Sequence, residues 1–327
     1  MTVDYSLFRR RVCAPDDLAG LKFDVLISAY NESERVNKLW TSVQADVRIW
    51  INHEEYGFDD NELPSAHHIH SGLVGEGEIQ FWSDLFSSSV LSEVSRDVRL
   101  AIDITGLMRP HVLALPLALA LHRFSNACAL YSDPSGYSGG SGAVFSKGPV
   151  LRVSAVNGFE GIHDTSTENR DVLILGAGYD DELITAVAES KRAAEQIVLV
   201  GLPSLQPHMY QESLLRLHRA SESINNYSRR DHIYAPASDP FTTAGVISEH
   251  ITHLRSINSD LNVYLSPVGP KTQVLGISWY YLCEAVNTST SVIFPYAESY
   301  ERETSKGIGR TRIFDLEIDL FRIDDYL

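Results

Sequence analysis

The sequence predicts an α/β fold built from two similar halves, each a doubly wound, mostly parallel sheet flanked by helices. Short apolar, β-branched runs recur along the chain, and each is followed by a turn and a helical stretch. One such unit, with the turn TGLMRP at 105–110, has a counterpart around Lys271. The stretch 311–321 alternates apolar and polar residues, which predicts a C-terminal antiparallel edge strand.

The first half starts after a polar lead-in. Asn31 or Ser33 is a suitable N-cap for its first helix, because their side-chain oxygens accept from first-turn N–H groups. Gly106 gives the turn at 105–110 freedom in φ, and Pro110 fits the first turn of the next helix, where an N–H is not needed. The expected elements are strands 23–29, 47–51, 99–104 and 127–131, a helix ending near 43, a helix over 78–94 and a helix from 111.

The pattern restarts after the polar segment 164–170, which we take as the linker between an N-terminal half, 1–163, and a C-terminal half, 164–327. Segment 150–161 is expected to bridge them. The second half is expected to contain strands 172–175, 197–200, 262–265, 291–294 and 311–321, with helices at 182–195, 210–220, 241–256 and after 271. Corresponding turns predict internal duplication of a Rossmann-like unit. The alternative is an ordinary doubly wound protein, in which such units repeat but their turns do not correspond.

Composition limits the function classes. The chain has 327 residues and a net charge of −16, which disfavours binding to long duplex nucleic acid but not to a small anion in a locally basic pocket. The cysteines are isolated, so no disulfide framework or zinc knuckle is indicated. The N-terminus lacks the apolar core of a signal peptide, and the longest apolar run, 112–121, is too short to span a bilayer. We therefore expect a cytoplasmic protein that does not contact a membrane.

Ligands of open parallel sheets bind at the carboxyl ends of the strands, where turns 29–34, 105–110, 176–181 and 266–271 would lie. Arg109 and Lys271 each begin a helix, where the dipole disfavours a cation unless an anion is bound. The alternative is a solvated or ion-paired charge. The predicted ligand-binding residues are Asn31, Thr105, Gly106, Arg109, Gly176, Gly178, Gly269, Lys271, Lys306 and Arg310.

Three further patterns have competing interpretations. Gly176-Ala177-Gly178 follows a strand, but Asp181 stands where a dinucleotide fingerprint has its third glycine, so helix capping is favoured and no cofactor is predicted. Histidines at 53, 67, 68 and 70 favour a solvated loop over a metal site. The basic segment 300–312, with Lys306, Arg310 and Arg312, would either close over an anion or form a flexible hairpin with solvated charges.

Candidate acid/base residues are few. Asp103 ends a central strand at the ligand edge, His111 lies beside Arg109, and Glu32 is in the first turn. Asp103 would otherwise orient Arg109 or bind a ribose hydroxyl, and His111 would otherwise donate to a phosphate or be structural. No Ser–His–Asp arrangement or nucleophile elbow is visible in the sequence. The sequence does not decide whether the protein is an enzyme, and it favours a protein without catalytic activity.

The turn at 105–110 resembles the signature of CARF domains, the Rossmann-like cyclic-oligonucleotide sensors of prokaryotic immunity. Thr105, Gly106 and Arg109 match the threonine, first glycine and basic residue of a Thr-Gly-Gly-Thr-Lys-type turn, whereas Leu107 and Met108 depart from it. In the second half, VGPK at 268–271 keeps a glycine and the lysine. Two such units in one chain are similar to SAVED domains, which are fused CARF-like pairs.

The resemblance implies a nucleotide sensor or regulatory subunit of an antiviral defence system, which binds its anion between the halves and acts through a partner effector protein. The alternatives are an enzyme acting on nucleotides or NAD-like glycosidic bonds, and a non-catalytic scaffold in which one half has lost its pocket. For a sensor with two equivalent cations, Arg109→Ala and Lys271→Ala are expected to abolish ligand binding alike, and loss in only one favours a single pocket.

Overall fold

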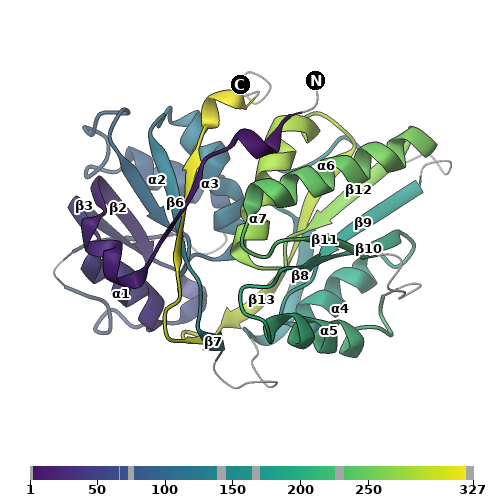
Figure 1. Ribbon diagram of the computed structural model, residues 1–327, viewed down its shortest axis with the longest axis horizontal. Helices are drawn as coiled ribbons and strands as arrows, with labels where there is room; N and C mark the ends of the chain where they lie inside the picture. The colour runs from purple at the N-terminus through teal and green to yellow at the C-terminus, as the bar shows by residue number, and fades with distance from the viewer. Residues whose placement is uncertain are drawn as a thin grey trace. The chain divides into compact units, whose positions relative to one another are not determined.

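A computed structural model describes residues 3–65, 67–72, 77–137, 145–163, 170–224 and 232–321. The chain divides into two compact units, each formed from segments that are distant in sequence (Figure 1). Unit N consists of Phe8–Ala143 and Ser299–Phe321, and unit C of Met1–Leu7, Val144–Glu298 and Arg322–Leu327. No helix among the described residues is both long and apolar enough to cross a membrane.

Unit N contains a mixed sheet in the order β1-β15-β6-β5-β2-β3-β4. The strands from β6 to β4 are parallel to their neighbours, and β15 is antiparallel to β6. The elements are β1 (Arg10–Cys13), β2 (Lys22–Ala29), α1 (Glu34–Ser42), β3 (Gln44–Asn52), β4 (His68–Ser71), α2 (Glu78–Ser87), β5 (Leu100–Asp103), α3 (Arg109–Leu121), β6 (Ala127–Ser132), β15 (Thr311–Leu316) and the ribbon of β7 (Gly136–Tyr137) and β14 (Ser305–Lys306).

Unit C contains a second sheet in the order β11-β10-β9-β12-β13-β8. The strands from β11 to β13 are parallel. Its elements are β8 (Ser146–Ala155), β9 (Arg170–Gly176), α4 (Asp181–Ser190), β10 (Glu195–Gly201), α5 (Met209–Arg219), β11 (His232–Ala235), α6 (Pro240–Ile257), β12 (Leu261–Ser266), α7 (Lys271–Tyr280) with a π-helical extension Tyr281–Ala285, and β13 (Thr290–Tyr300).

The parallel strands have the same order in both units. In chain order, each sheet reads third, second, first, fourth, fifth: β4-β3-β2-β5-β6 in unit N and β11-β10-β9-β12-β13 in unit C. The predicted α/β fold with two mostly parallel sheets is confirmed. The turns around Arg109 and Lys271 are equivalent, because each follows the fourth strand and begins the next helix.

Several boundaries differ from the prediction. The C-terminal strand is antiparallel as expected, but β1 pairs with its outer side, so β15 is not the edge. Figure 1 shows this yellow strand beside β6. Because β15 joins the sheet of unit N, 299–321 belong to that unit and not to the C-terminal half. Segment 150–161 does not bridge the halves: Ser146–Ala155 is a strand of the unit C sheet.

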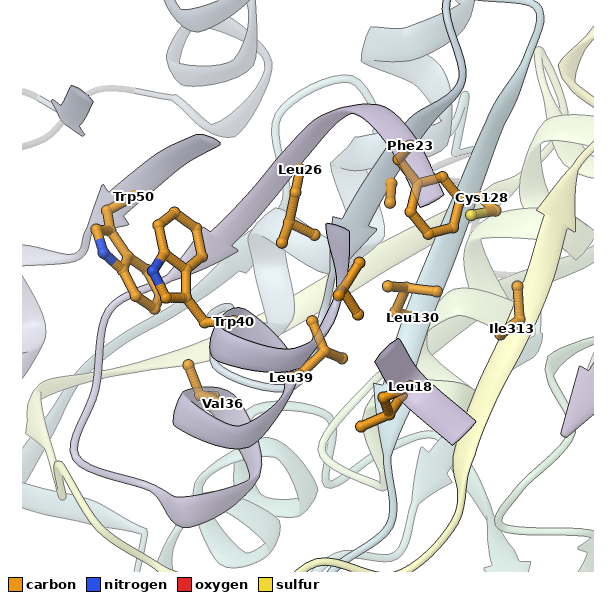
Figure 2. Packing of buried hydrophobic residues seen from close by; sticks show 12 residues of the cluster. Leu18, Phe23, Leu26, Val36, Leu39, Trp40, Trp50, Cys128, Leu130 and Ile313 are labelled. Carbon is orange, nitrogen blue, oxygen red and sulfur yellow. The ribbon is translucent and has the colours of Figure 1, made fainter. Parts of the chain in front are cut away.

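Helix α1 packs on one face of the unit N sheet. It buries Val36, Leu39 and Trp40 in a core cluster that includes Leu26 of β2 and Leu130 of β6 (Figure 2). The Trp40 ring stacks on Trp50 at a centroid distance of 3.6 Å. Such a pair adds about 0.5–1.5 kcal/mol beyond the burial of apolar area. This packing sets the position of the first turn of α1, which carries part of the candidate site.

Candidate functional site

The sheet of unit N has its switch point between β2 and β5, because the chain continues from β2 toward β3 on one side and from β5 toward β6 on the other. The loops that follow these two strands meet there. A Cβ atom at Gly106 would lie 2.5 Å from the Ala29 carbonyl oxygen and 3.0 Å from Asn31 Nδ2. Gly106 does not have a positive φ, so its role is this close approach and not the conformational freedom predicted from the sequence.

Gly106→Ala is therefore expected to destabilise the protein by roughly 1–3 kcal/mol, because the obstructing atom belongs to the backbone and cannot rotate away. Gly20→Ala is the matched control, since nothing lies within 4 Å of a Cβ atom there. Urea unfolding of both variants measures the difference. An equal effect of the two substitutions would show that the loops are not held at the distance seen here.

Asp103 and Thr105 hold the loop after β5 in place. Asp103 is fully buried; its Oδ2 accepts from Ser28 Oγ at 2.8 Å and its Oδ1 from the Thr105 N–H at 2.9 Å. Thr105 Oγ1 in turn accepts from the Ser132 N–H at 3.1 Å. Both carboxylate oxygens of Asp103 are thus engaged by the protein. This arrangement favours a positioning role for Asp103 over acid/base chemistry.

Arg109 is the first residue of α3 and lies near two phenols. Burial raises the pKa of Tyr56 to about 12, and the charge of Arg109 acts in the opposite direction. Burial also raises the pKa of Tyr131, against the opposing charges of Arg35 and Arg109. Tyr56 donates to the Gly106 carbonyl oxygen at 2.9 Å. The two phenols therefore place Arg109 beside the switch-point loops.

Arg35, which the sequence analysis did not select, is the most informative residue at this edge. It is the second residue of α1 and only 6% exposed. Its Nε donates to Ser305 Oγ at 2.9 Å, and its Nη1 to the Ser132 carbonyl oxygen at 2.7 Å. No carboxylate among the described residues lies within ion-pair distance of it. A buried cation without an ion-pair partner is unfavourable, so the site is suited to an anion.

Ser33 adds a second polar group to the first turn of α1. It is 4% exposed, and its hydroxyl has no hydrogen-bond partner in the part of the chain that the structure describes. Its N–H donates to Asn31 Oδ1 at 3.0 Å, so the Asn31 side chain and not the Ser33 hydroxyl turns the chain into the helix. The free hydroxyl stands two residues from the Arg35 guanidinium, at a helix N-terminus.

Asp133 is surrounded by arginines. It is 3% exposed and receives Arg312 through both Nε and Nη2, with Nη2 2.7 Å from Oδ2. Burial raises the pKa of Asp133, whereas the charges of Arg312, Arg35 and Arg310 lower it. One carboxylate thus faces three guanidinium groups, and Arg35 shares Tyr131 with Arg109. This edge of unit N is locally cationic in a chain whose net charge is −16.

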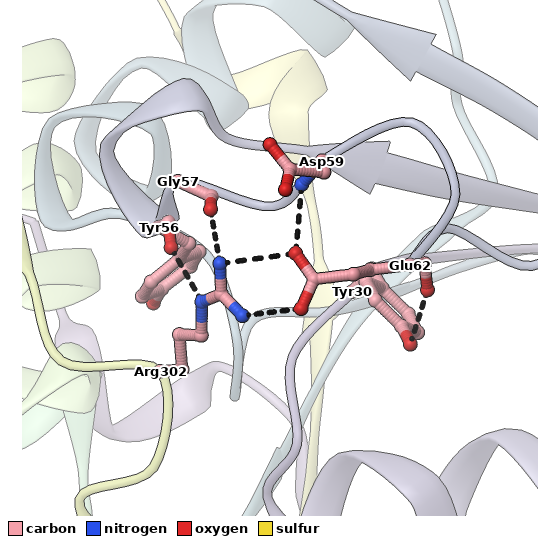
Figure 3. Close-up of polar contacts among 6 residues, drawn as sticks. All are labelled: Tyr30, Tyr56, Gly57, Asp59, Glu62 and Arg302. Atoms are coloured by element: carbon pink, nitrogen blue, oxygen red, sulfur yellow. Dashed lines mark hydrogen bonds and ion pairs between the residues drawn. The ribbon is translucent and has the colours of Figure 1, made fainter.

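The segment 300–312 is held by Arg302 and not by the residues predicted to bind an anion. Arg302 donates to the carbonyl oxygens of Tyr56 and Gly57 and forms an ion pair with Glu62 at 2.8 Å (Figure 3). Lys306 lies in the β14 ribbon, and the Arg310 carbonyl accepts from the Asp133 N–H at 2.8 Å. Arg312 is paired with Asp133. That Lys306 or Arg310 contacts an anion stays a prediction.

His53, which the sequence placed in a solvated loop, is 2% exposed and belongs to an aromatic cluster with His111 and Phe81. The His111 ring lies 4.5 Å from that of His53 and 4.6 Å from that of Phe81. Burial lowers the pKa of His111 to about 3, which keeps the ring neutral. His53 accepts from the Met108 N–H at 3.3 Å. Within the described ranges, no cluster of three or more His, Cys, Asp or Glu side chains has a geometry that would hold a metal ion. Glu32 is exposed.

The corresponding edge of unit C has the opposite charge. Asp180 caps α4 by accepting from the Leu183 N–H at 3.2 Å, and Asp181 pairs with the buried Arg216 at 2.9 Å. Helix capping thus explains the acidic residues after the Gly-Ala-Gly turn. A Cβ atom at Gly178 would overlap the Val268 carbonyl oxygen, so this glycine allows two loops to touch.

Gly176 and Gly269 share the same close packing. A Cβ atom at Gly176 would lie 3.2 Å from the Gly269 N atom, and one at Gly269 would lie 2.9 Å from Gln273 Oε1. Lys271 begins α7 and is partly buried. Among the ligand-binding residues predicted in unit C, only Lys271 carries a positive charge. It lies at the same edge of the sheet as the N-terminus of α4, which begins with carboxylates.

Comparisons with family models, curated proteins and solved structures found no match to this chain. The functional argument accordingly depends on the geometry of unit N. The resemblance of its turn to the CARF signature stays a prediction. Leu107 and Met108, the two departures from that signature, are buried.

Proposed function

We propose that unit N binds a small nucleotide-type anion at the carboxyl edge of its sheet, and that the chain serves as a ligand sensor or regulatory subunit. The observation that carries this proposal is Arg35, a buried guanidinium with two neutral hydrogen-bond acceptors and no carboxylate within ion-pair distance among the described residues. A bound anion supplies the missing counter-charge.

Phosphate suits this position better than a carboxylate group alone. Nε and Nη1 of Arg35 donate to the protein, so Nη2 is the group that reaches a phosphate oxygen, and Ser33 offers a hydroxyl at the N-terminus of α1. Arg109 begins α3 on the other side of the switch point, so two helix N-termini and two arginines serve one anion. Nucleotides occupy this crevice in doubly wound folds generally.

The geometry favours binding over turnover. Both oxygens of Asp103 are held by the protein, His111 is neutral within an aromatic cluster, and Glu32 is exposed. These three candidates do not form an acid/base pair on one substrate position. The resemblance of the 105–110 turn to CARF and SAVED sensors gives the biological context that we infer: a cyclic oligonucleotide or related nucleotide as ligand, a cytoplasmic antiviral system and an effector protein as partner.

The test is a thermal-shift panel of mononucleotides, dinucleotides and cyclic oligonucleotides, with product analysis of each mixture. A ligand at 100 times its dissociation constant stabilises the folded state by about 2.7 kcal/mol. We expect the shift without turnover in the wild type and in Lys271→Ala, and its loss in Arg109→Ala. Loss in both variants would contradict a site confined to unit N, and product formation would identify an enzyme.

A further inference from the structure

A second cluster of reactive side chains lies in unit C, at the amino ends of its strands and therefore at the opposite edge from the turns considered above. Asp171, Asn262 and Ser291 are the second residues of β9, β12 and β13. These strands are adjacent and parallel; Asn262 is level with Asp171, and Ser291 is level with Tyr264, two residues further along β12. His163, from the segment before β9, completes the cluster.

The serine and histidine are in direct contact. His163 Nε2 lies 2.6 Å from Ser291 Oγ, and the Gly161 N–H donates to the same oxygen at 2.7 Å. The Ser291 oxygen thus has both a backbone N–H and the imidazole as partners, and Nε2 accepts the hydroxyl proton when the neutral ring carries its own proton on Nδ1. A Cβ atom at Gly161 would lie 2.5 Å from the Thr290 carbonyl carbon, so only glycine brings this segment so close to Ser291.

The imidazole of His163 is positioned by ring stacking. Asn262 Nδ2 donates to Asp171 Oδ1 at 3.0 Å, and His163 Nδ1 is buried without a hydrogen-bond partner among the described residues. The imidazole stacks on Tyr264, with 4.6 Å between centroids and an angle of 11°. Burial lowers the pKa of His163 below its ordinary value, and Lys191 adds to this, whereas Asn262 and Asp171 act against it. The imidazole is therefore neutral at pH 7 and able to accept a proton.

We infer that Ser291 is a nucleophile activated by His163, with Tyr264 as a positioning residue, and that it accepts acyl groups from small esters. Ser291 Oγ bonds to the carbonyl carbon as its proton passes to His163 Nε2. The bond to the alcohol then breaks, and the alcohol leaves with that proton. Water hydrolyses the acyl–serine and restores both residues.

The surroundings limit the substrate to a slender one. Ser291 is 4% exposed, whereas His163 is partly exposed and Ile162 beside it is 68% exposed. Because the hydroxyl is buried, the inferred substrate is a short, uncharged acyl ester and not a bulky or strongly anionic one. This activity is independent of the anion site in unit N.

Labelling of the full chain with a small fluorophosphonate, read by intact mass and peptide mapping, tests the inference. The reagent forms an Oγ–P bond with loss of fluoride and needs no other reactant. We expect one adduct on Ser291, none on Ser291→Ala, and labelling about 100-fold slower on His163→Gln. Ser289→Ala is the control, because its hydroxyl donates to the Leu261 carbonyl and has no histidine partner.

The wild type provides a second measurement if a variant does not fold. Its labelling rate is expected to rise with pH and to reach half its plateau below pH 6.5, because the neutral imidazole is the base and its pKa is lowered. No adduct on the folded wild type, or labelling of His163→Gln at the wild-type rate, would overturn the inference. p-Nitrophenyl acetate hydrolysis that is lost in Ser291→Ala would support the ester class.

Discussion

Arg312→Met is expected to lower the free energy of unfolding by about 3–5 kcal/mol at pH 7, the largest effect among these predictions, because it leaves Asp133 buried without its bidentate partner. The charges of Arg35 and Arg310 are smaller influences on that carboxyl group. Urea unfolding measures the loss. Arg310→Met is the matched control, since its side chain is exposed, and it is expected to cost no more than about 0.5 kcal/mol.

The loss in Arg312→Met is expected to shrink as the pH falls. Burial already raises the pKa of Asp133, and removal of Arg312 takes away the largest opposing influence. A carboxyl group whose pKa is higher in the folded than in the unfolded state favours folding below its folded pKa, and this contribution is lost as pH rises. Asp133→Asn in the Arg312→Met background should likewise recover stability. A deficit that is independent of pH would contradict a buried, unpaired carboxylate.

Arg35→Met is expected to weaken binding of a phosphate-bearing ligand by roughly 10- to 150-fold, corresponding to the 1.5–3 kcal/mol of a charge-assisted hydrogen bond. The readout is the melting temperature in millimolar phosphate against chloride at equal ionic strength. Phosphate should raise it in the wild type and leave Arg35→Met unchanged.

Two variants control for charge alone. Lys22→Met removes an exposed cation at the other end of β2 and should keep the phosphate response. Arg35→Lys keeps a positive charge but not the planar pair of donors, so an intermediate response is expected. A phosphate response in Arg35→Met equal to that of the wild type would mean that the anion binds elsewhere.

The sequence predicted the parallel strands well, because buried strands such as β2, β5 and β12 are continuous apolar runs with clear turns on both sides. It missed β4 and β11, which are short and contain histidines. The sequence also did not predict where β15 lies in the sheet. Alternating apolar and polar residues predict a strand with one solvent-exposed face, but not that β1 pairs with its outer side. Pairing between segments so distant in sequence leaves no local signal.

The candidate site was predicted in part. Arg109 was selected because a cation in the first turn of a helix opposes the dipole, and the same argument applies to Arg35, the second residue of α1. Arg35 was overlooked because acidic neighbours surround it in the sequence, and only the fold shows that it is buried while they are exposed. Arg109 and Lys271 occupy equivalent positions in the two units, but the residues around them differ in charge.

A crystal structure of the chain with a bound nucleotide tests the central claim most directly. The account predicts a phosphate group within hydrogen-bond distance of the Arg35 guanidinium and the Ser33 hydroxyl, beside the N-terminus of α3. A nucleotide seated instead against Lys271 in unit C, with the Arg35 position unchanged and without an anion, would contradict it.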